Sequence, residues 1–194
     1  MIAALFVRDE RVRAGDDPHR PQTGGHIRQS ERPMLLFLDF DGVLHPDAVF
    51  RRSDGRIELR ADGELFMWAP ILVEALSGLA SVRVVLSTSW VRHLGFQRAR
   101  KALPAELRML VIGATWHSAM RRTDQGSIAW DEQTRYQQIA TYLTQLSSAP
   151  TDWLAIDDDN RGWPDAKREH LLLTDSAHGL SSLNVTDLRA KLTT

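Results

Sequence analysis

The chain contains no cysteine, and this absence excludes disulfide bonds, thiolate nucleophiles and metal centres with cysteine ligands. It also has no excess of either charge, since 24 Lys and Arg residues and 25 Asp and Glu residues give a formal net charge of −1. A global basic field for DNA or RNA is therefore excluded, and nucleic-acid binding would need a local basic patch. The 194 residues are 43% hydrophobic and 25% charged, which is typical of one globular domain.

Long apolar segments are missing as well. No window approaches the roughly 20 apolar residues that a membrane-spanning helix requires. Residues 1–7 are apolar, but they continue into the charged residues 8–10 and no basic segment precedes them, whereas a signal peptide begins with positive charge. We therefore expect a cytoplasmic protein that makes no membrane contact.

The first 33 residues differ in composition from the rest of the chain. Residues 14–33 hold three prolines and three glycines and almost no apolar side chains. Such a segment cannot bury enough apolar surface to offset the entropy that ordering would cost. We expect residues 1–33 to form a flexible N-terminal arm and residues 34–194 to form one folded domain.

From residue 34 onward, short apolar runs alternate with helix-like segments. The first run, MLLFL, is apolar without alternation, which favours a central parallel strand covered on both faces. Expected strands lie at residues 34–38, 82–86, 108–112, 153–156 and 170–173, and expected helices at residues 70–80, 90–103, 131–146 and 185–192. The alternation predicts an α/β fold with a five-stranded parallel sheet and helices on both faces.

One short segment interrupts this alternation after the first strand. Residues 49–52 and 56–59 are strand-like and flank an Asp54-Gly55 turn, which is a strong hairpin signal. We therefore expect a small β-hairpin flap beside the sheet.

Polar side chains follow three of the expected strands where each strand ends. Asp39 and Asp41 follow the first strand, residues 87–89 (Ser-Thr-Ser) follow the second, and Asp157 and Asp158 follow the fourth. Ligands of parallel sheets bind beyond the carboxyl ends of the strands. Clustered carboxylates repel one another unless a cation neutralises them, and an all-oxygen donor set suits Mg²⁺.

Three motifs at these strand ends resemble those of one enzyme superfamily. Residues 36–44 (LFLDFDGVL) match hhhDxDGhh, the first motif of the haloacid dehalogenase-like (HAD) phosphohydrolases. Residues 84–89 (VVLSTS) resemble the second motif, and residues 154–158 (LAIDD) resemble the fourth. Together with the STSW, IDDD and LLLTDSAHGLS segments, they make the chain most similar to the small-cap HAD domain associated with bacterial RNA-repair proteins. The resemblance covers residues 34 to about 175 and implies a Rossmann-like HAD fold.

The resemblance implies a role for each residue of the first two motifs. Asp39 is the expected nucleophile, which forms an aspartyl-phosphate, and Asp41 is the expected acid and base. Gly42, which we place among the substrate-binding residues, lets the backbone turn so that both acids face one pocket. Thr88 is the expected hydrogen-bond donor to a phosphoryl oxygen, and Ser87 takes this role if the strand ends one residue earlier.

The fourth motif implies a metal site. The resemblance places Mg²⁺ on Asp39, on the backbone carbonyl of Asp41 and on Asp157, with Asp158 binding directly or through water. Asp159 is expected to be a turn residue that faces solvent.

The third motif of the superfamily is a cation, usually lysine, at the start of a helix. No lysine lies between Lys101 and Lys167, so this sequence departs from the pattern. Arg135 fits best, because its planar guanidinium can bridge a carboxylate and a phosphate. Arg121 and Arg122 in the preceding loop are alternatives, and a solvated helix arginine is the ordinary interpretation of Arg135.

Residues that follow the second motif are candidates for substrate binding. Ser89 donates another hydrogen bond or caps the following helix. Trp90 and Arg92 lie where a base or ribose would stack, although Trp90 also fits ordinary packing between helix and sheet. His45 lines the pocket or occupies a turn beside Pro46.

The segment between Gly42 and Val82 holds only a hairpin and one helix, so the cap is minimal and the pocket open. An open pocket favours nucleotides or polynucleotide ends over small enclosed metabolites. The leading hypothesis is a Mg²⁺-dependent phosphomonoesterase that acts on nucleotide or nucleic-acid terminal phosphates. The alternatives are a small-metabolite phosphatase of the same fold and a non-catalytic HAD-like interaction module.

Overall fold

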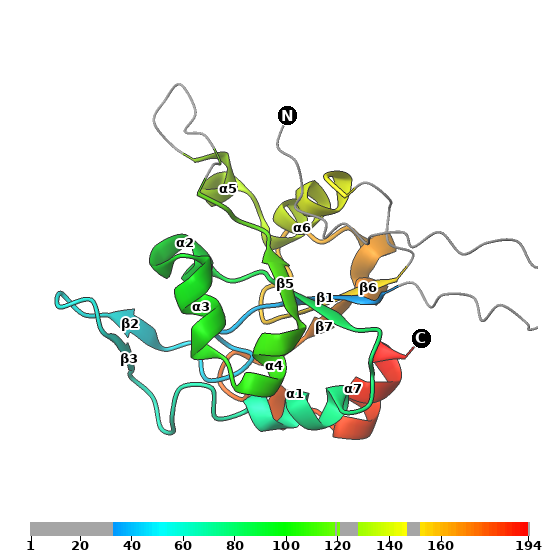
Figure 1. Cartoon of the computed structure of the whole chain (residues 1–194), viewed down its shortest axis with the longest axis horizontal. Helices are drawn as coiled ribbons and strands as arrows, with labels where there is room; N and C mark the ends of the chain where they lie inside the picture. The colour runs from blue at the N-terminus through cyan, green and yellow to red at the C-terminus, as the bar shows by residue number, and fades with distance from the viewer. Residues whose placement is uncertain (1–32, 119, 121–127, 147–151, 194) are drawn as a thin grey trace, which may run out of the picture. The chain divides into compact units, whose positions relative to one another are not determined.

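The computed structural model describes residues 33–118, 120, 128–146 and 152–193. Here five parallel strands form one sheet in the order β5-β4-β1-β6-β7 (Figure 1). The strands are β1 (Leu35–Leu38), β4 (Arg83–Leu86), β5 (Val111–Ala114), β6 (Trp153–Asp157) and β7 (Leu171–Leu173). The predicted α/β fold with a five-stranded parallel sheet is therefore confirmed.

Helices connect these strands, and a separate hairpin follows β1. The helices are α1 (Ala69–Leu76), α2 (Ser89–Leu94), α3 (Phe96–Ala102), α4 (Ala105–Leu110), α5 (Ala129–Glu132), α6 (Arg135–Thr144) and α7 (Val185–Leu192), with 3₁₀ turns η1 (Asp165–His170) and η2 (Leu180–Ser182). The predicted hairpin is present as the antiparallel pair β2 (Val49–Arg51) and β3 (Ile57–Leu59).

The central strand β1 explains why its sequence is apolar without alternation. Leu36 and Leu38 point into one hydrophobic cluster, which also contains buried side chains of α1 and α7. Leu35 and Phe37 point to the opposite face, where Ile139 of α6 packs against them. Successive side chains of a strand face opposite sides, so a strand covered by helices on both sides has to be apolar at every position.

The third expected strand lies further along the chain than the sequence indicated. Residues 105–110 form α4, and the strand begins only at Val111. The helix is amphipathic, since Leu107 is fully buried whereas Met109 is 77% exposed. A short apolar run fits a helix and a strand equally well, so the predicted strand at residues 108–112 was wrong by about half its length.

Two expected helices are each divided in the structure. Gly95 adopts φ +85° and separates α2 from α3 within the segment predicted as one helix at residues 90–103. Residues 133 and 134 separate α5 from α6 within the segment predicted at residues 131–146. The second break has a local cause, because Thr134 and Gln137 form a capping box in which Thr134 is the N-cap and Arg135 is the first residue of α6.

The predicted N-terminal arm, residues 1–33, lies outside the described residues apart from Pro33, so the division of the chain there stays a prediction. In the described ranges, no helix combines the length and the apolar character needed to span a bilayer.

Candidate active site

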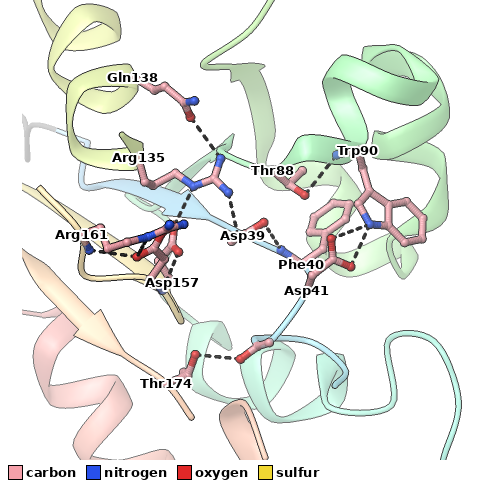
Figure 2. A network of polar contacts seen from close by, with 12 residues as sticks. Asp39, Phe40, Asp41, Thr88, Trp90, Arg135, Gln138, Asp157, Arg161 and Thr174 are labelled. Carbon is pink, nitrogen blue, oxygen red and sulfur yellow. Dashed lines mark hydrogen bonds and ion pairs between the residues drawn. The ribbon is translucent and has the colours of Figure 1, made fainter. Parts of the chain in front are cut away.

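The carboxyl ends of β1, β4 and β6 bring the predicted polar residues together. The Asp39 amide donates to the Ile156 carbonyl at 3.1 Å, which extends the pairing of β1 with β6 by one residue. Figure 2 shows the Asp39 side chain between Arg135 and Thr88, with Asp157 beside Arg135. Asp39 and Asp157 are 5% and 1% exposed, so two carboxylates are buried at one edge of the sheet.

Arg135 is the cation of this cluster. Its Nη2 donates to Asp39 Oδ2 at 2.9 Å, and its Nε forms an ion pair with Asp157 Oδ2, also at 2.9 Å. The Nη1 atom donates to Gln138 Oε1 at 3.1 Å, one turn further along α6. The side chain is only 15% exposed. Arg135 is therefore no solvated helix residue, and it occupies the place that the resemblance implied for the lysine.

Arg121 and Arg122, the alternatives for this cation, lie outside the described residues. Gln138 did not stand out in the sequence as part of the site. Its only sequence signal is its position three residues after Arg135, on the same helical face.

The groups around Asp39 shift the pKa of its carboxyl in opposite directions. Burial raises the pKa of the Asp39 carboxyl above its ordinary value, and the neighbouring charge of Asp41 acts in the same direction. The Arg135 guanidinium lowers this pKa, as do hydrogen bonds from the Phe40 amide, at 2.7 Å, and from Thr88. The cation and these donors thus favour the ionised form, which a nucleophilic carboxylate requires.

Three carboxylates form a candidate metal site. Oxygen atoms of Asp39, Asp157 and Asp158 lie within 4.8 Å of one another. Burial, with the charge of Asp39, raises the pKa of Asp157 well above its ordinary value, and the same causes raise that of Asp158 to about 6. Burial is the largest cause of these raised pKa values, and repulsion between the carboxylates adds to it. A hard divalent cation with oxygen ligands fits this donor set.

Gly42 packs directly against the side chain of Asp158. Its φ is +67°, and a Cβ atom at this position would overlap the Asp158 side chain. Its carbonyl oxygen accepts a 2.8 Å hydrogen bond from the hydroxyl of Thr174, a residue that sequence reasoning missed (Figure 2). Gly42 is buried, so the structure gives it a role in backbone geometry and not the substrate contact that we predicted.

Two donors hold the Asp41 carboxylate. The indole Nε1 of Trp90 lies 3.0 and 3.2 Å from its two oxygens (Figure 2), and His45 Nε2 lies 3.1 Å from Oδ1. The Phe66 amide donates to His45 Nδ1 at 3.2 Å, so the ring proton is on Nε2 and the imidazole donates to Asp41. Among the described residues, Phe66 is the one non-glycine residue with positive φ, at 64°. This unfavourable backbone conformation aims its amide at His45.

The Trp90 ring is buried in a cluster of aromatic side chains. The side chain is only 6% exposed, and its rings pack edge-to-face on Phe40 and Phe66 with centroid separations of 5.6 and 5.3 Å. The packing role that we left open as the alternative for Trp90 is therefore observed, together with a hydrogen bond to Asp41. The residue also lines a cavity beside α2, so its stacking role stays a prediction.

The second motif has two hydroxyl candidates, and Thr88 is the one beside the nucleophile. Its hydroxyl lowers the pKa of the Asp39 carboxyl, and it accepts from the Trp90 amide at 3.4 Å as the N-cap of α2. Ser87 is buried, its amide donates to the Leu38 carbonyl at 2.9 Å, and its hydroxyl has no partner among the described residues. The geometry favours Thr88.

The two remaining candidates for substrate binding differ. Ser89 lines the cavity in front of Asp39. Arg92 instead forms a two-pronged ion pair with Asp131, at 3.0 and 3.2 Å, and its guanidinium lies 5.7 Å from the ring of Trp116. Arg92 therefore links α2 to α5. Its guanidinium is paired with Asp131 in this structure, whereas we predicted a contact with substrate.

The cavity in front of the nucleophile, here called the acidic cavity, has a volume of about 400 Å³. It is lined by Asp39, Asp41, Asp47, Ser89, Arg135, Asp158, Asp159, Arg161 and Ser176. Asp159, the expected turn residue, accepts from exposed Arg161 at 2.7 Å, and this hydrogen bond lowers its pKa. The cavity thus offers carboxylates for a cation and two guanidinium groups for a phosphate.

Comparisons with known proteins identify the family of this chain. Residues 35–185 match the family described as "HAD domain in Swiss Army Knife RNA repair proteins". A search of curated proteins finds no match. Among solved structures, a Vibrio cholerae protein named as a 3-deoxy-D-manno-octulosonate 8-phosphate phosphatase is 16% identical, with 83% of each chain covered and a TM-score of 0.42. The family match spans most of the chain, and the chain therefore belongs to the HAD phosphatase superfamily, in the family of HAD domains found in Swiss Army Knife RNA repair proteins.

Proposed function

We propose that the chain is a Mg²⁺-dependent phosphomonoesterase that forms an aspartyl-phosphate at Asp39 and acts on terminal phosphates of nucleotides or nucleic acids. The observation that carries the proposal is the setting of Asp39. A buried carboxylate contacts the Arg135 guanidinium at 2.9 Å, and a second carboxylate, Asp41, lies two residues further with its own donors.

In the first half-reaction, an Asp39 oxygen attacks the phosphorus atom while the bond to the leaving oxygen breaks. The Asp41 carboxyl gives its proton to that oxygen, which leaves as an alcohol. Arg135 and the Thr88 hydroxyl bind phosphoryl oxygens and orient the group for in-line attack.

In the second half-reaction, the Asp41 carboxylate takes a proton from water. The water oxygen attacks phosphorus, the bond between phosphorus and the Asp39 oxygen breaks, and inorganic phosphate leaves. Asp39 is restored as a carboxylate and Asp41 as an acid, so the cycle is closed.

Mg²⁺ would be held by the carboxylates of Asp39, Asp157 and Asp158, and by the Asp41 carbonyl that the resemblance implies. When bound, it supplies positive charge that offsets the negative charge of the carboxylates and of the phosphoryl group. Arg135 offsets part of this charge from the protein side, since it contacts Asp39 and Asp157 at once.

The open site supports the choice of substrate. Between Gly42 and Val82 the chain forms only the β2–β3 hairpin, α1 and connecting turns, so this described segment supplies no large cap over the acidic cavity. A nucleic-acid end needs such access for the chain that continues from it. The family description names RNA repair proteins, which fits the same substrate class.

A phosphatase screen tests the proposal. Nucleoside monophosphates, oligonucleotides with 3′- or 5′-terminal phosphate, sugar phosphates and p-nitrophenyl phosphate are compared with Mg²⁺ and with EDTA. Asp39→Asn should lower kcat by at least roughly a thousandfold, because the amide keeps the shape but removes the nucleophile. Asp187→Asn makes the same chemical change on the exposed face of α7, outside the site, and is the matched control.

The outcomes separate the parts of the proposal. Activity that survives in Asp39→Asn contradicts the covalent mechanism, and activity that is unchanged in EDTA contradicts the metal. A preference for sugar phosphates over nucleotides leaves a phosphatase but contradicts the nucleic-acid substrate.

A further inference from the structure

A second cavity, here called the flap cavity, opens between the β2–β3 hairpin and α2. Its volume is about 280 Å³, just below the roughly 300–1,000 Å³ of pockets for drug-sized ligands. Val49, Arg51 and Ile57 line it from the hairpin, Ser89, Trp90, His93 and Leu94 line it from α2, and Asp41 also contributes to it. The volume suits one group of nucleoside size.

The flap cavity adjoins the acidic cavity. Asp41 and Ser89 line both of them, so the two spaces meet at the carboxyl that would protonate the leaving oxygen. With a phosphoryl group at Asp39, the leaving oxygen has to lie beside Asp41, and the rest of the leaving group then extends into a space next to Asp41. The flap cavity is such a space.

One face of the hairpin builds the wall of this cavity. Val49 and Arg51 are two residues apart on β2, and Ile57 is the cross-strand partner of Arg51. Phe50 lies between them in the sequence and faces the other side, where the Arg60 guanidinium lies 4.4 Å from its ring. The part of the wall that the hairpin supplies therefore consists of two aliphatic side chains and one arginine.

Arg51 differs from the other arginines of the hairpin. Arg52 and Arg60 form ion pairs with Glu58 at 3.7 and 3.9 Å, and Arg56 pairs with Asp54 at 3.7 Å. Arg51 has no acidic partner in the described ranges, although it lines a cavity that contains Asp41. A guanidinium with free donors beside a cavity is suited to a phosphate or phosphodiester group.

We propose that the flap cavity binds the leaving group of the phosphomonoester, and that this group is a nucleoside whose adjacent phosphodiester is bound by Arg51. The proposal rests on the proposed function and makes it narrower, since it selects an oligonucleotide end over a free mononucleotide. The aliphatic side chains of Val49, Ile57 and Leu94 contact the nucleoside, and the Arg51 guanidinium contacts the next phosphate.

A third cavity, of about 420 Å³ beside α5 and α6, does not fit this role. It is lined by Trp130, Asp131, Glu132, Arg135 and neighbouring residues, and Asp41 does not contribute to it. It shares Ser89, Arg135, Asp159 and Arg161 with the acidic cavity, but it does not adjoin the carboxyl that would protonate the leaving oxygen.

The test measures ratios of kcat/KM for three substrates in the full chain with Mg²⁺. These are glycerol 3-phosphate, a nucleoside monophosphate, and a dinucleotide that carries the same terminal phosphate. Arg51→Gln should lower the ratio of dinucleotide to mononucleotide about tenfold, through KM, because one charged hydrogen bond is lost. Ile57→Thr keeps a β-branched residue in β3 and should lower the ratio of mononucleotide to glycerol 3-phosphate several-fold.

Arg52→Gln is the matched control, since Arg52 follows Arg51 in the same hairpin but does not line the flap cavity. Both ratios should stay within about twofold of wild type in this variant. Melting curves of all variants show whether the hairpin and the fold persist. If a variant melts early, the same ratios are measured in the wild type at raised NaCl. The phosphate contact of exposed Arg51 is the charge interaction that distinguishes the dinucleotide from the mononucleotide, so salt should lower their ratio.

The outcomes are distinct. A dinucleotide ratio that is equal in wild type, Arg51→Gln and Arg52→Gln overturns the proposal, as does a ratio that is insensitive to salt. These results would still leave the proposed phosphatase in place if Asp39→Asn is inactive. The absence of Asp39-dependent hydrolysis of any of the three substrates would instead contradict the proposed function itself.

Discussion

At the residue scale, the setting of Asp41 distinguishes this site. Its carboxylate accepts hydrogen bonds from Trp90 and His45, so both of its oxygens have a protein partner before any substrate arrives. The His45 proton is fixed on Nε2 by the Phe66 amide, which comes from a residue 21 positions away in the chain. These contacts fix the orientation of the residue that we propose as acid and base.

Trp90→Phe tests this positioning. The substitution keeps an aromatic ring in the cluster with Phe40 and Phe66 but removes the indole N–H. We expect kcat for an alkyl phosphate, whose leaving group needs a proton, to fall about tenfold through loss of one hydrogen bond to a charged group. Activity on p-nitrophenyl phosphate should fall much less, because its leaving group is stable as an anion. Steady-state kinetics on both substrates measure the difference, and equal losses on both would point to a packing defect.

Asp158→Asn tests the charge of the metal-free cluster. The pKa of Asp158 is raised to about 6, so the contribution of this group to stability is present below its ordinary value of 3.8 and is lost as pH rises through about 6. In EDTA, the variant should melt a few degrees above wild type at pH 7.5 and at the same temperature at pH 4. The gain is modest because the carboxylate is half-buried and solvent screens it. Melting curves at the two pH values measure it, and a gain that persists at pH 4 would indicate another cause.

At the element scale, the start of α6 decides where Arg135 lies. Thr134 accepts from the Gln137 amide at 3.4 Å, and the Gln137 side chain accepts from the Thr134 amide at 2.9 Å. Gly162 packs against Thr134 with φ +74°, and a Cβ there would be too close to the threonine side chain. Arg135 is the first residue of the helix, so its backbone position depends directly on this cap.

Thr134→Ala should therefore affect stability and catalysis together. Loss of the cap costs about 1 kcal/mol, which lowers Tm by roughly 2–4 °C in a domain of this size. We also expect KM for phosphate esters to rise, because the first turn that carries Arg135 frays. Differential scanning calorimetry and steady-state kinetics measure the two effects.

Asn184→Ala is the control for that prediction. Asn184 caps α7 by accepting from the Thr186 amide at 2.7 Å, and it does not line the acidic cavity. Its loss should lower Tm by a similar amount and leave KM unchanged. Equal KM effects in both variants would mean that the cap of α6 has no special connection to the site.

The elements also show which part of the fold the sequence could predict. Buried strands such as β1 were found because apolar runs of strand length are unambiguous when Gly and Asp follow them. The strand predicted at residues 108–112 was misplaced, because a short apolar run fits a helix and a strand equally well and residues 105–110 form α4. The break before α6 could have been recognised from the Thr134-Gln137 spacing, which is a local signal.

At the scale of the whole molecule, some site residues could be predicted from the sequence and others could not. Asp39, Thr88 and Asp157 could be placed because each ends a strand, and parallel strands bring their carboxyl ends to one edge. The roles of His45, Phe66 and Thr174 could not, because each depends on a contact between segments far apart in the chain. Sequence periodicity carries no information about such contacts.

The backbone beside the proposed nucleophile belongs to the five-stranded sheet, so it should open much less often than the backbone of the β2–β3 hairpin. The amides of Asp39 and Ser87 donate to the carbonyls of Ile156 and Leu38, inside the five-stranded ladder. Amides in such positions exchange with solvent only when the whole domain opens, whereas amides of an isolated two-stranded hairpin exchange through local opening. We expect hydrogen exchange in D₂O to be slowest at Asp39 and Ser87 and fast at Arg52, whose amide bonds only to the Arg56 carbonyl across the turn. If so, the backbone beside the proposed nucleophile persists as long as the native state does, while the hairpin wall opens and closes many times within that interval.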